Sequence, residues 1–311
     1  MEFFHKVTRY PFMHTRRRWY AVSAIIIVGS LVALFARGLN FGIDFTGGVV
    51  LELSFPQAAE LEKVRGALGK AGFGEAAVQS FGTPQDVLVR LLPEEGRDVN
   101  QLAGSVLDAV RAYEPGVELR RTEVVGPQVG QELAEKGALA VLFTFLLILA
   151  YVAFRFQWKL GLGAILAALH DPIVILGIFA ATGLTFDLPS LAAILAVIGY
   201  SLNDTVVVFD RIRERFLSLR KGTPEQVMDA AINETLSRTI MTSGTTMITV
   251  LALLFFGGEI LRGFATALTI GIVVGTYSSI YVASALALDL KLTARDLLPA
   301  EREKGAVDDM P

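Results

Sequence analysis

The sequence predicts a polytopic α-helical membrane protein with six transmembrane helices and one α+β domain outside the membrane. Hydrophobic residues make up 53% of the 311 residues, and the mean hydropathy of +0.52 is too high for an ordinary soluble domain. Six apolar runs approach the length of about 20 residues that a helix needs to cross a bilayer. One long segment of mixed polarity, 38–136, separates the first two runs.

Each predicted span is an uninterrupted apolar run that ends at charge, glycine or proline. The spans are 20–37, 137–154, 160–182, 188–208, 239–257 and 264–288. The remaining segments are an N-terminal segment (1–19), a helical loop within 137–288 at about 209–238, and a C-terminal tail (289–311). The first run lacks an Ala-x-Ala exit and is too long for the apolar region of a signal peptide, so we expect it to stay as an anchor.

The distribution of Lys and Arg predicts the orientation. Basic residues gather before the first span, after the second, after the fourth and after the sixth, whereas the alternate short loops hold Asp187 or Glu259 with Arg262. The basic set is Lys6, Arg9, Arg16, Arg17, Arg18, Arg155, Lys159, Arg211, Arg213, Arg215, Arg220, Lys221, Arg238, Lys291 and Arg295. The positive-inside rule therefore places both termini in the cytoplasm and segment 38–136 outside it.

The extracytoplasmic segment alternates strand and helix patterns. Strands are predicted at 49–55, 78–81, 87–91 and 117–125, and helices at 58–68 and 99–112. This βαββαβ order is the ferredoxin-like split arrangement. The segment has no His, and the whole chain has no Cys, which excludes disulfides, thiolate metal sites and a cysteine nucleophile. We expect a binding or mechanical module and not an enzyme.

Asp204 is the main candidate functional residue, because its helix continues directly from the apolar run 188–198. A carboxylate at that depth costs about 2.5 to 3.5 kcal/mol on insertion scales, so it needs a partner or a task. Ser201 lies three residues earlier and shares its helix face. Arg238 on the fifth span is the expected counter-ion, because both residues lie in the cytoplasmic half of their helices.

A polar stripe runs along the fifth span. Arg238, Thr242, Thr245 and Thr249 are spaced i, i+4, i+7 and i+11 on an otherwise apolar helix. Exposing such a polar stripe to lipid would cost free energy, so the stripe is predicted to point into the bundle. The alternative is that Arg238 reaches the headgroups and that the threonine hydroxyls bond the carbonyls four residues back.

His170 and Asp171 lie side by side and interrupt the apolar third span. The pair serves either as a titrating relay or as hydrogen-bonded structural residues, and Pro172 kinks the helix.

A capping box is predicted before the fifth span, at Thr223, Pro224 and Gln226. It starts a helix at the membrane surface, which is expected to end near Leu236.

Four stretches taken together resemble the SecF family. They are Gly-Ile-Asp-Phe-Thr-Gly-Gly at 42–48, with Gly42, Asp44, Gly47 and Gly48; His170-Asp171; the run 199–205 with Ser201, Asn203 and Asp204, continuing through 209–214; and Ser237-Arg238-Thr239 with Thr242-Ser243. SecF is the smaller integral subunit of the SecDF translocation accessory complex, in the resistance-nodulation-division superfamily of proton-driven transporters. The resemblance therefore implies proton-motive-force-driven export of preproteins, located in the bacterial inner membrane.

The resemblance also implies roles for residues and partners. Asp204 would accept the proton and Arg238 would be its charge partner, with Ser201 and Thr242 lining the path; Asn203, Thr245 and Thr249 are further candidates. Protons would be the coupling ion, with no cofactor. The implied partners are SecD as the missing six-helix half, the SecYEG channel, SecA indirectly, YajC, preprotein clients and the lipid bilayer, with no nucleic acid.

Four other functions fit the residues less well. A half-sized proton-coupled lipid or small-molecule exporter of the same superfamily would use the same Asp-Arg pair for proton coupling. Such an exporter needs a larger outward domain with an aromatic-lined pocket. An intramembrane aspartyl protease would pair Asp171 with Asp204, but its Gly-x-Gly-Asp context is missing, and a serine protease would need a second glycine after Ser201. A passive scaffold does not explain a buried charge.

Overall fold

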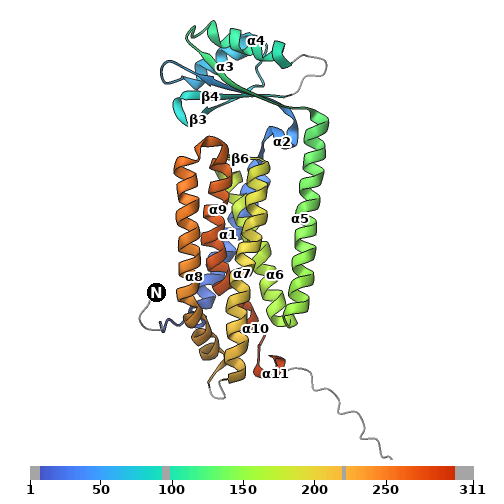
Figure 1. The fold of residues 1–311 in the computed structure, drawn as a ribbon, viewed down its shortest axis with the longest axis vertical. Coiled ribbons are helices and arrows are strands. Elements are labelled where there is room, and N and C mark those ends of the chain that lie inside the picture. The colour runs from blue at the N-terminus through green and yellow to red at the C-terminus, as the bar shows by residue number, and fades with distance from the viewer. Residues whose placement is uncertain (1–7, 93–98, 219–221, 298–311) are drawn as a thin grey trace, which may run out of the picture.

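A computed structural model describes residues 8–92, 99–218 and 222–297. The chain forms a long helical bundle with a small α+β domain at one end (Figure 1). Six helices are long and apolar enough to cross a membrane, which confirms the predicted fold class. They run Met13–Arg37, Pro127–Arg155, Trp158–Thr182, Leu188–Ser218, Pro224–Phe256 and Ile260–Asp289. The predicted segments 1–19 and 289–311 lie partly outside the described residues.

The bundle is built from α1 (Arg16–Arg37), α5 (Pro127–Arg155), α6 (Trp158–Thr182), α7 (Leu188–Ser218) and α8 (Pro224–Phe256). The short helix η1 (Met13–Thr15) precedes α1. The last span is α9 (Gly258–Ser278), followed without a break by the π-helical segment η2 (Ser279–Ser284) and α10 (Ala285–Asp289). A short helix, α11 (Ala294–Leu297), lies at the lower end of the bundle.

The α+β domain has the predicted βαββαβ order. It contains β2 (Gly48–Ser54), α3 (Leu61–Lys70), β3 (Ala77–Phe81), β4 (Thr83–Leu91), α4 (Val99–Arg111) and β5 (Glu118–Val125). The strands form one antiparallel sheet in the order β3-β4-β2-β5. Alternate strand residues such as Leu51 and Val89 are fully buried with Val64 of α3 and Val106 of α4. The two helices cover one face of the sheet, and the other face looks toward the bundle (Figure 1).

A glycine-rich turn joins the first span to the domain. The strand β1 (Asn40–Phe41) pairs in parallel with β6 (Thr185–Phe186), and α2 (Ile43–Thr46) follows β1. Gly48 has φ +131, and a Cβ there would lie 2.5 Å from the Leu91 carbonyl oxygen. A Cβ on Gly130 of α5 would lie 2.7 Å from the Gly47 nitrogen. Only glycine fits these close approaches, which fix the domain above the helices.

The predicted capping box is confirmed, but the surface helix is not. The Gln226 backbone N–H donates to Thr223 Oγ1 (3.3 Å), and the Thr223 N–H donates to Gln226 Oε1 (3.1 Å). The expectation that this helix ends near Leu236 is wrong, because α8 continues unbroken into the membrane span. Arg211 and Arg215 of α7 both bond Glu234, which clasps the lower ends of α7 and α8 together. The predicted loop at 209–238 is therefore largely an extension of the two spans.

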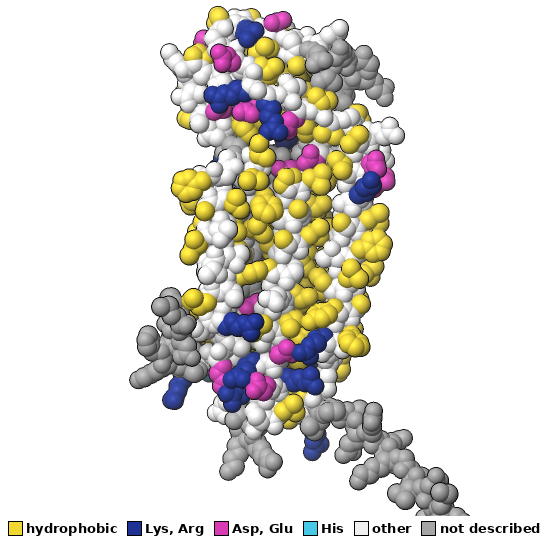
Figure 2. All heavy atoms as spheres, viewed as in Figure 1, with side chains coloured by type: hydrophobic (Ala, Val, Ile, Leu, Met, Phe, Trp, Pro, Cys, Tyr) yellow, Lys and Arg dark blue, Asp and Glu magenta, His cyan; other side chains and the backbone are white. Residues whose placement is uncertain are grey.

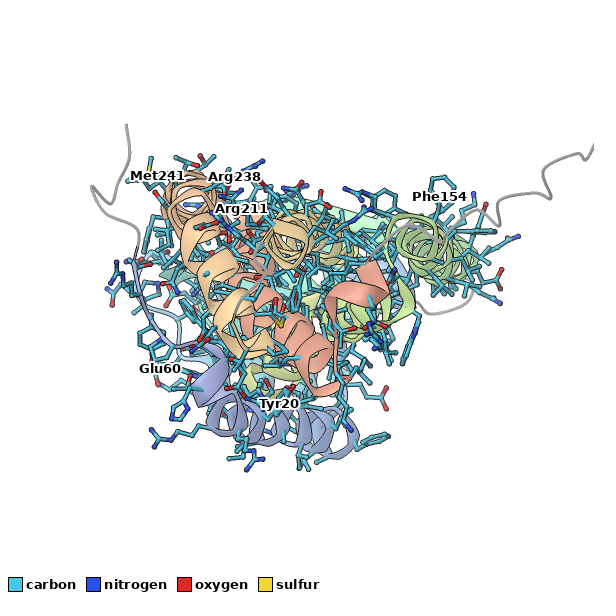
Figure 3. The ribbon with its side chains drawn as sticks, turned by 90° about the horizontal axis from the view of Figure 1, so that it is seen from below. Tyr20, Glu60, Phe154, Arg211, Arg238 and Met241 are labelled. Atoms are coloured by element: carbon cyan, nitrogen blue, oxygen red, sulfur yellow. The ribbon has the colours of Figure 1, made fainter. Side chains whose placement is uncertain are left out.

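Charged side chains lie toward the two ends of the visible face, with an apolar band between them (Figure 2). Exposed apolar side chains are concentrated on α1 and α5, including Phe35 and Phe154. Phe154 projects from α5 at the edge of the bundle (Figure 3). Exposing large apolar side chains to water is unfavourable, whereas lipid chains accommodate them. These exposed side chains are therefore what a lipid-facing surface requires.

Close packing of α1 on α6 gives a prediction about stability. A Cβ on Gly177 of α6 would lie 2.2 Å from the Cβ of Ser30 on α1, whereas a Cβ on Gly199 of α7 would meet nothing within 4 Å. Gly177→Ala is expected to lower the free energy of unfolding in detergent by about 1–3 kcal/mol relative to Gly199→Ala. Both are helical positions, so the comparison isolates the clash. Equal stability of the two variants would contradict this packing.

Candidate functional site

Asp204 lies inside the bundle where α7, α8 and the last span meet. Its side chain is 8% exposed, and each carboxylate oxygen accepts one hydroxyl hydrogen bond. Thr239 Oγ1 of α8 donates to Oδ1 at 2.7 Å, and Ser279 Oγ donates to Oδ2 at 2.7 Å. The carboxyl group therefore links three membrane helices through two short hydrogen bonds.

Asp171 is a second buried carboxylate, on α6, and it is 0% exposed. Ser201 Oγ of α7 and Ser278 Oγ of α9 donate to its Oδ2 at 2.5 and 3.0 Å. His170 Nδ1 lies 3.0 Å from its Oδ1. Ser201, which was predicted to line the path at Asp204, therefore contacts Asp171 instead.

Neighbouring serines of the last span bind the two carboxylates. Ser278 contacts Asp171 and Ser279 contacts Asp204, at the junction of α9 with the π-helical segment η2. Within this segment Ser284 Oγ donates to the Ser279 carbonyl oxygen at 2.9 Å, five residues back. Short π-helical segments inside α-helices recur at functional sites. The sequence reasoning did not single out these serines, although they form a polar pair inside the apolar run 264–288.

The structure does not show the predicted charge pair between Asp204 and Arg238 as a direct ion pair. Arg238 is exposed and lies with Met241 at the periphery of the bundle, where Figure 3 labels both residues. Among the residues described, no Lys or Arg forms an ion pair with Asp204. Successive helix positions are rotated by about 100°, so Thr239 faces inward while Arg238 faces outward.

The predicted inward stripe on α8 also points the other way. Thr242, Thr245 and Thr249 are exposed. Their hydroxyls donate to carbonyls of their own helix, at Arg238 (3.0 Å), Met241 (2.9 Å) and Thr245 (3.3 Å). This is the alternative that the sequence left open, and it satisfies each hydroxyl locally. Asn203 of α7 is likewise exposed.

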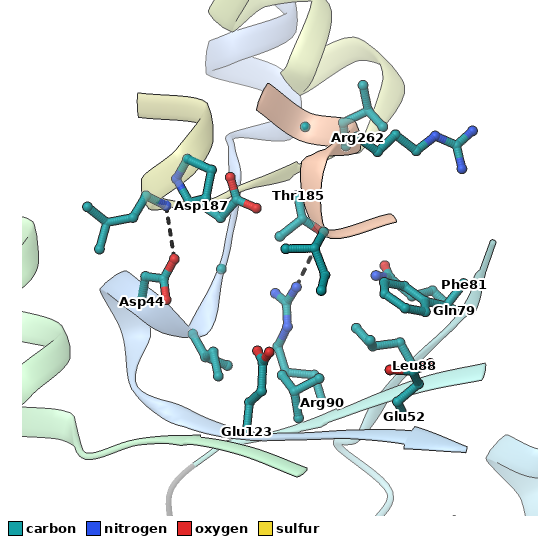
Figure 4. Close-up of a pocket in the computed structure, with 18 of the residues that line it drawn as sticks. Asp44, Glu52, Gln79, Phe81, Leu88, Arg90, Glu123, Thr185, Asp187 and Arg262 are labelled. Carbon is teal, nitrogen blue, oxygen red and sulfur yellow. Dashed lines mark hydrogen bonds between the residues drawn. The ribbon is translucent and has the colours of Figure 1, made fainter. Parts of the chain in front are cut away.

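A second cluster of polar groups lies between the domain and the bundle (Figure 4). Asp44 Oδ2 accepts from the Leu188 N–H at 2.9 Å, at the first turn of α7. Arg90 of β4 donates to the Phe41 carbonyl (2.7 Å), to Asn40 Oδ1 (3.2 Å) and to Thr185 Oγ1 (3.4 Å). Burial lowers the pKa of Arg90 from its usual value.

This junction encloses a cavity of about 540 Å³. Its lining includes Glu52 and Glu123 of the sheet, and Asp187 and Arg262 at the top of the bundle. Gly42 and Asp44 of the predicted motif line it too, while Gly47 and Gly48 form the turn into β2. Within the described ranges no three His, Asp or Glu side chains gather in a way that could hold a metal ion.

Comparison with known proteins identifies the family. The family model described as "Protein export membrane protein SecD/SecF, C-terminal" matches residues 105–293, and the "SecD/SecF GG Motif" model matches residues 32–59. The chain is 49% identical over 303 residues to the protein translocase subunit SecF of Vibrio alginolyticus, with 96% of each chain covered. The chain belongs to the SecF family of protein translocase subunits.

Other relatives agree with the SecF assignment. The SecF of Pseudomonas aeruginosa is 48% identical over 306 residues, covering 98% of this chain and 99% of its own. The crystal structure of SecDF from Thermus thermophilus superposes with a TM-score of 0.81 at 41% identity, covering 91% of this chain and 39% of the SecDF chain. A SecDF structure in a super-membrane-facing form gives a TM-score of 0.68 at 42% identity, with the same coverage. The resemblance predicted from the sequence motifs is therefore confirmed.

Proposed function

We propose that this chain is a proton-motive-force-driven subunit that promotes export of preproteins through the SecYEG channel. The observation that carries the proposal is the buried carboxylate of Asp204, whose hydrogen-bond partners among the described residues are the hydroxyls of Thr239 and Ser279 inside an apolar bundle. Burying a carboxylate in a membrane span is costly, so the site favours a group that gains and loses a proton. Protons would be the coupling ion, and no other cofactor is required.

The charge distribution supports an orientation with both termini in the cytoplasm of a bacterial cell, across the inner membrane. In Figure 2, Lys and Arg gather at the end of the bundle opposite the domain. Arg16, Arg155 and Arg211 form ion pairs there. By the positive-inside rule this end is cytoplasmic, so the α+β domain lies outside.

The outer face of α8 supports assembly with a second six-helix unit. This face carries the stripe of Arg238, Thr242, Thr245 and Thr249, and lipid would not solvate the charged guanidinium of Arg238. The chain matches 39% of a SecDF chain, which leaves room for a SecD half. If SecD covered the stripe, Arg238 would be buried next to Thr239, the residue that contacts Asp204. The low dielectric of a buried site would then strengthen the attraction between the Arg238 guanidinium and the Asp204 carboxylate. The predicted charge pairing would then depend on the assembled complex.

Protonation of Asp204 would change how the helices are held. The ionised carboxylate accepts hydrogen bonds from Thr239 and Ser279, whereas the neutral acid must donate one hydrogen itself. One of the two contacts is then weakened, which loosens α8 or the last span against α7. The membrane potential supplies about 2.3 kcal/mol per charge per 100 mV.

The junction described above would carry the change to the outward domain. Arg90 ties the sheet to β1 and β6, and Asp44 ties the same linker to the start of α7, the helix that carries Asp204. The two SecDF structures match this chain with nearly equal identity and coverage but different TM-scores, which supports more than one arrangement of these parts in that family.

Reconstitution tests the proposal. Proteoliposomes containing SecYEG, SecA, SecD and this chain would be loaded with a preprotein arrested part-way, and ATP would then be removed. An imposed proton gradient should complete export, and a protonophore, or omission of SecD, should abolish the effect; YajC can be added to measure its contribution. Completion that is equally fast without the gradient would refute proton coupling.

A further inference from the structure

The site contains a buried histidine and carboxylate that the proposed mechanism at Asp204 does not use. We infer that His170 and Asp171 form a second proton-holding site, whose protonation is linked to that of Asp204 through Ser278 and Ser279. This inference rests on the proposed function and adds a second titrating site to it.

The partners of Asp171 favour a group that exchanges protons. Its carboxyl group is fully buried, and it accepts hydrogen bonds from Ser201 and Ser278. Among the described residues no Lys or Arg lies within ion-pair distance of it. Neutral hydroxyls offset only part of the desolvation cost of a buried charge. The adjacent imidazole of His170, 3.0 Å away, is the group that can share a proton with it.

His170 has a free ring nitrogen at this site. Its side chain is 7% exposed, Nδ1 faces Asp171, and Nε2 has no hydrogen-bond partner among the described atoms. A buried polar nitrogen is costly to leave unpaired, so Nε2 is the atom of the cluster that remains to take up a proton. Among the described residues, Tyr277 of α9 has its ring centroid 6.1 Å from the imidazole, and Asp204 of α7 is linked to the pair through Ser278 and Ser279.

The two serines can respond to the protonation of the carboxylates. Ser278 Oγ lies 3.0 Å from Asp171 Oδ2 and 3.2 Å from the Gly275 carbonyl oxygen. Ser279 Oγ lies 2.7 Å from Asp204 Oδ2 and 3.1 Å from the Thr276 carbonyl oxygen. Each hydroxyl therefore has a second acceptor on its own helix, to which it can turn when its carboxylate is protonated.

Because the serines are consecutive, a shift of the chain at one of them moves the other. The π-helical segment η2 begins at Ser279, and such single-turn segments inside α-helices are frequent at functional sites. A proton from water would form an O–H bond on Asp171 or an N–H bond on His170, and its release to water would restore the starting state. No other bond forms or breaks.

Imidazole NMR tests the linkage directly. The chain has three histidines, His5, His14 and His170, so a ¹⁵N-histidine-labelled complex with SecD gives few signals, which His5→Gln and His14→Gln assign. At the same pH, the ring ¹⁵N signals of His170, which report its protonation, should differ between the wild type and Asp204→Asn because the two sites are linked. Identical His170 signals in the two proteins would overturn the inference.

A milder pair of variants covers the case in which Asp204→Asn fails to assemble. Thr239→Val removes a hydroxyl that donates to Asp204, whereas Thr235→Val removes a buried hydroxyl on the same helix that donates only to Ala231 and Ile232 carbonyls. The first should change the His170 ring signals and the second should not; equal spectra would refute the linkage.

Proton flux separates this inference from the proposed function. Asp171→Asn in proteoliposomes should change the pH profile of the flux, and Asp171→Glu should restore it. If Asp204→Asn abolishes flux while the His170 ring signals stay unchanged and Asp171→Asn keeps the wild-type pH profile, the proposed function holds and the second site fails. If flux persists in Asp204→Asn, the proposed function itself fails.

Discussion

Asp204→Asn is expected to reduce gradient-driven export to the level of vesicles that lack this chain, while the complex with SecD still assembles. Asn keeps the size of the side chain and can still accept from Thr239 or Ser279, but it cannot take up a proton at physiological pH. The measurement is the rate at which an arrested preprotein is released under an imposed proton gradient. Co-purification with SecD checks that the variant is folded.

Asp210→Asn is the matched control for that variant. Asp210 lies on the same helix and pairs with Arg155 at 2.5 Å near the lower end, where both side chains are partly exposed. Exposed ion pairs contribute about 0–1 kcal/mol, so this change should leave release close to the wild-type rate. If the two variants lost preprotein release to the same extent, removal of any carboxylate from α7 would be enough to explain the loss. The special role of Asp204 would then be refuted.

Arg90→Gln is expected to uncouple the domain from the membrane helices. The substitution removes the guanidinium that bonds the Phe41 carbonyl, Asn40 and Thr185, so the sheet loses its tie to β1 and β6. Hydrogen bonds to charged groups contribute about 1.5–3 kcal/mol each, and loss of one corresponds to about a tenfold or larger effect on coupling. Proton flux should persist while the stimulation of export falls by about tenfold or more.

Arg120→Gln controls for a general effect of losing an arginine from the domain. Arg120 lies on β5 and pairs with Asp86 at 3.2 Å, within the domain and away from the linker. Flux and release measured on the same vesicles should both stay near wild type in this variant. If Arg90→Gln lowers flux and release in equal proportion, Arg90 acts on the helices themselves and the mechanical link is wrong.

Sequence patterns were sufficient for the parts of the fold that depend on local chemistry. Apolar length located all six spans, and strand alternation located the βαββαβ domain, because each pattern reflects which faces must be buried. The capping box at Thr223 and Gln226 was visible because it involves residues three positions apart. The end of that helix was misjudged, because no proline or cap separates Leu236 from the apolar run and α8 continues unbroken from Pro224 to Phe256.

The candidate site was predicted only in part. Asp204 stood out because a charged residue inside an apolar run can be recognised from the sequence alone. Its partners come from two other helices and could not be identified from spacing. Helical spacing showed that Arg238 and the threonines share a face, yet it cannot tell whether that face meets the bundle, lipid or another subunit. Ser278 and Ser279 were missed because serine is tolerated in membrane helices and gives no signal until its neighbours are known.

The central claim is that the Asp204 carboxyl gains and loses a proton as the subunit works, and infrared spectroscopy of the complex with SecD measures this directly. A difference spectrum recorded on changing pH should contain a protonated-carboxyl C=O band that disappears in Asp204→Asn and persists in Asp210→Asn. A band that remains in Asp204→Asn and is lost in Asp171→Asn would belong to the second site. Difference spectra that are identical in the wild type and Asp204→Asn would contradict the account.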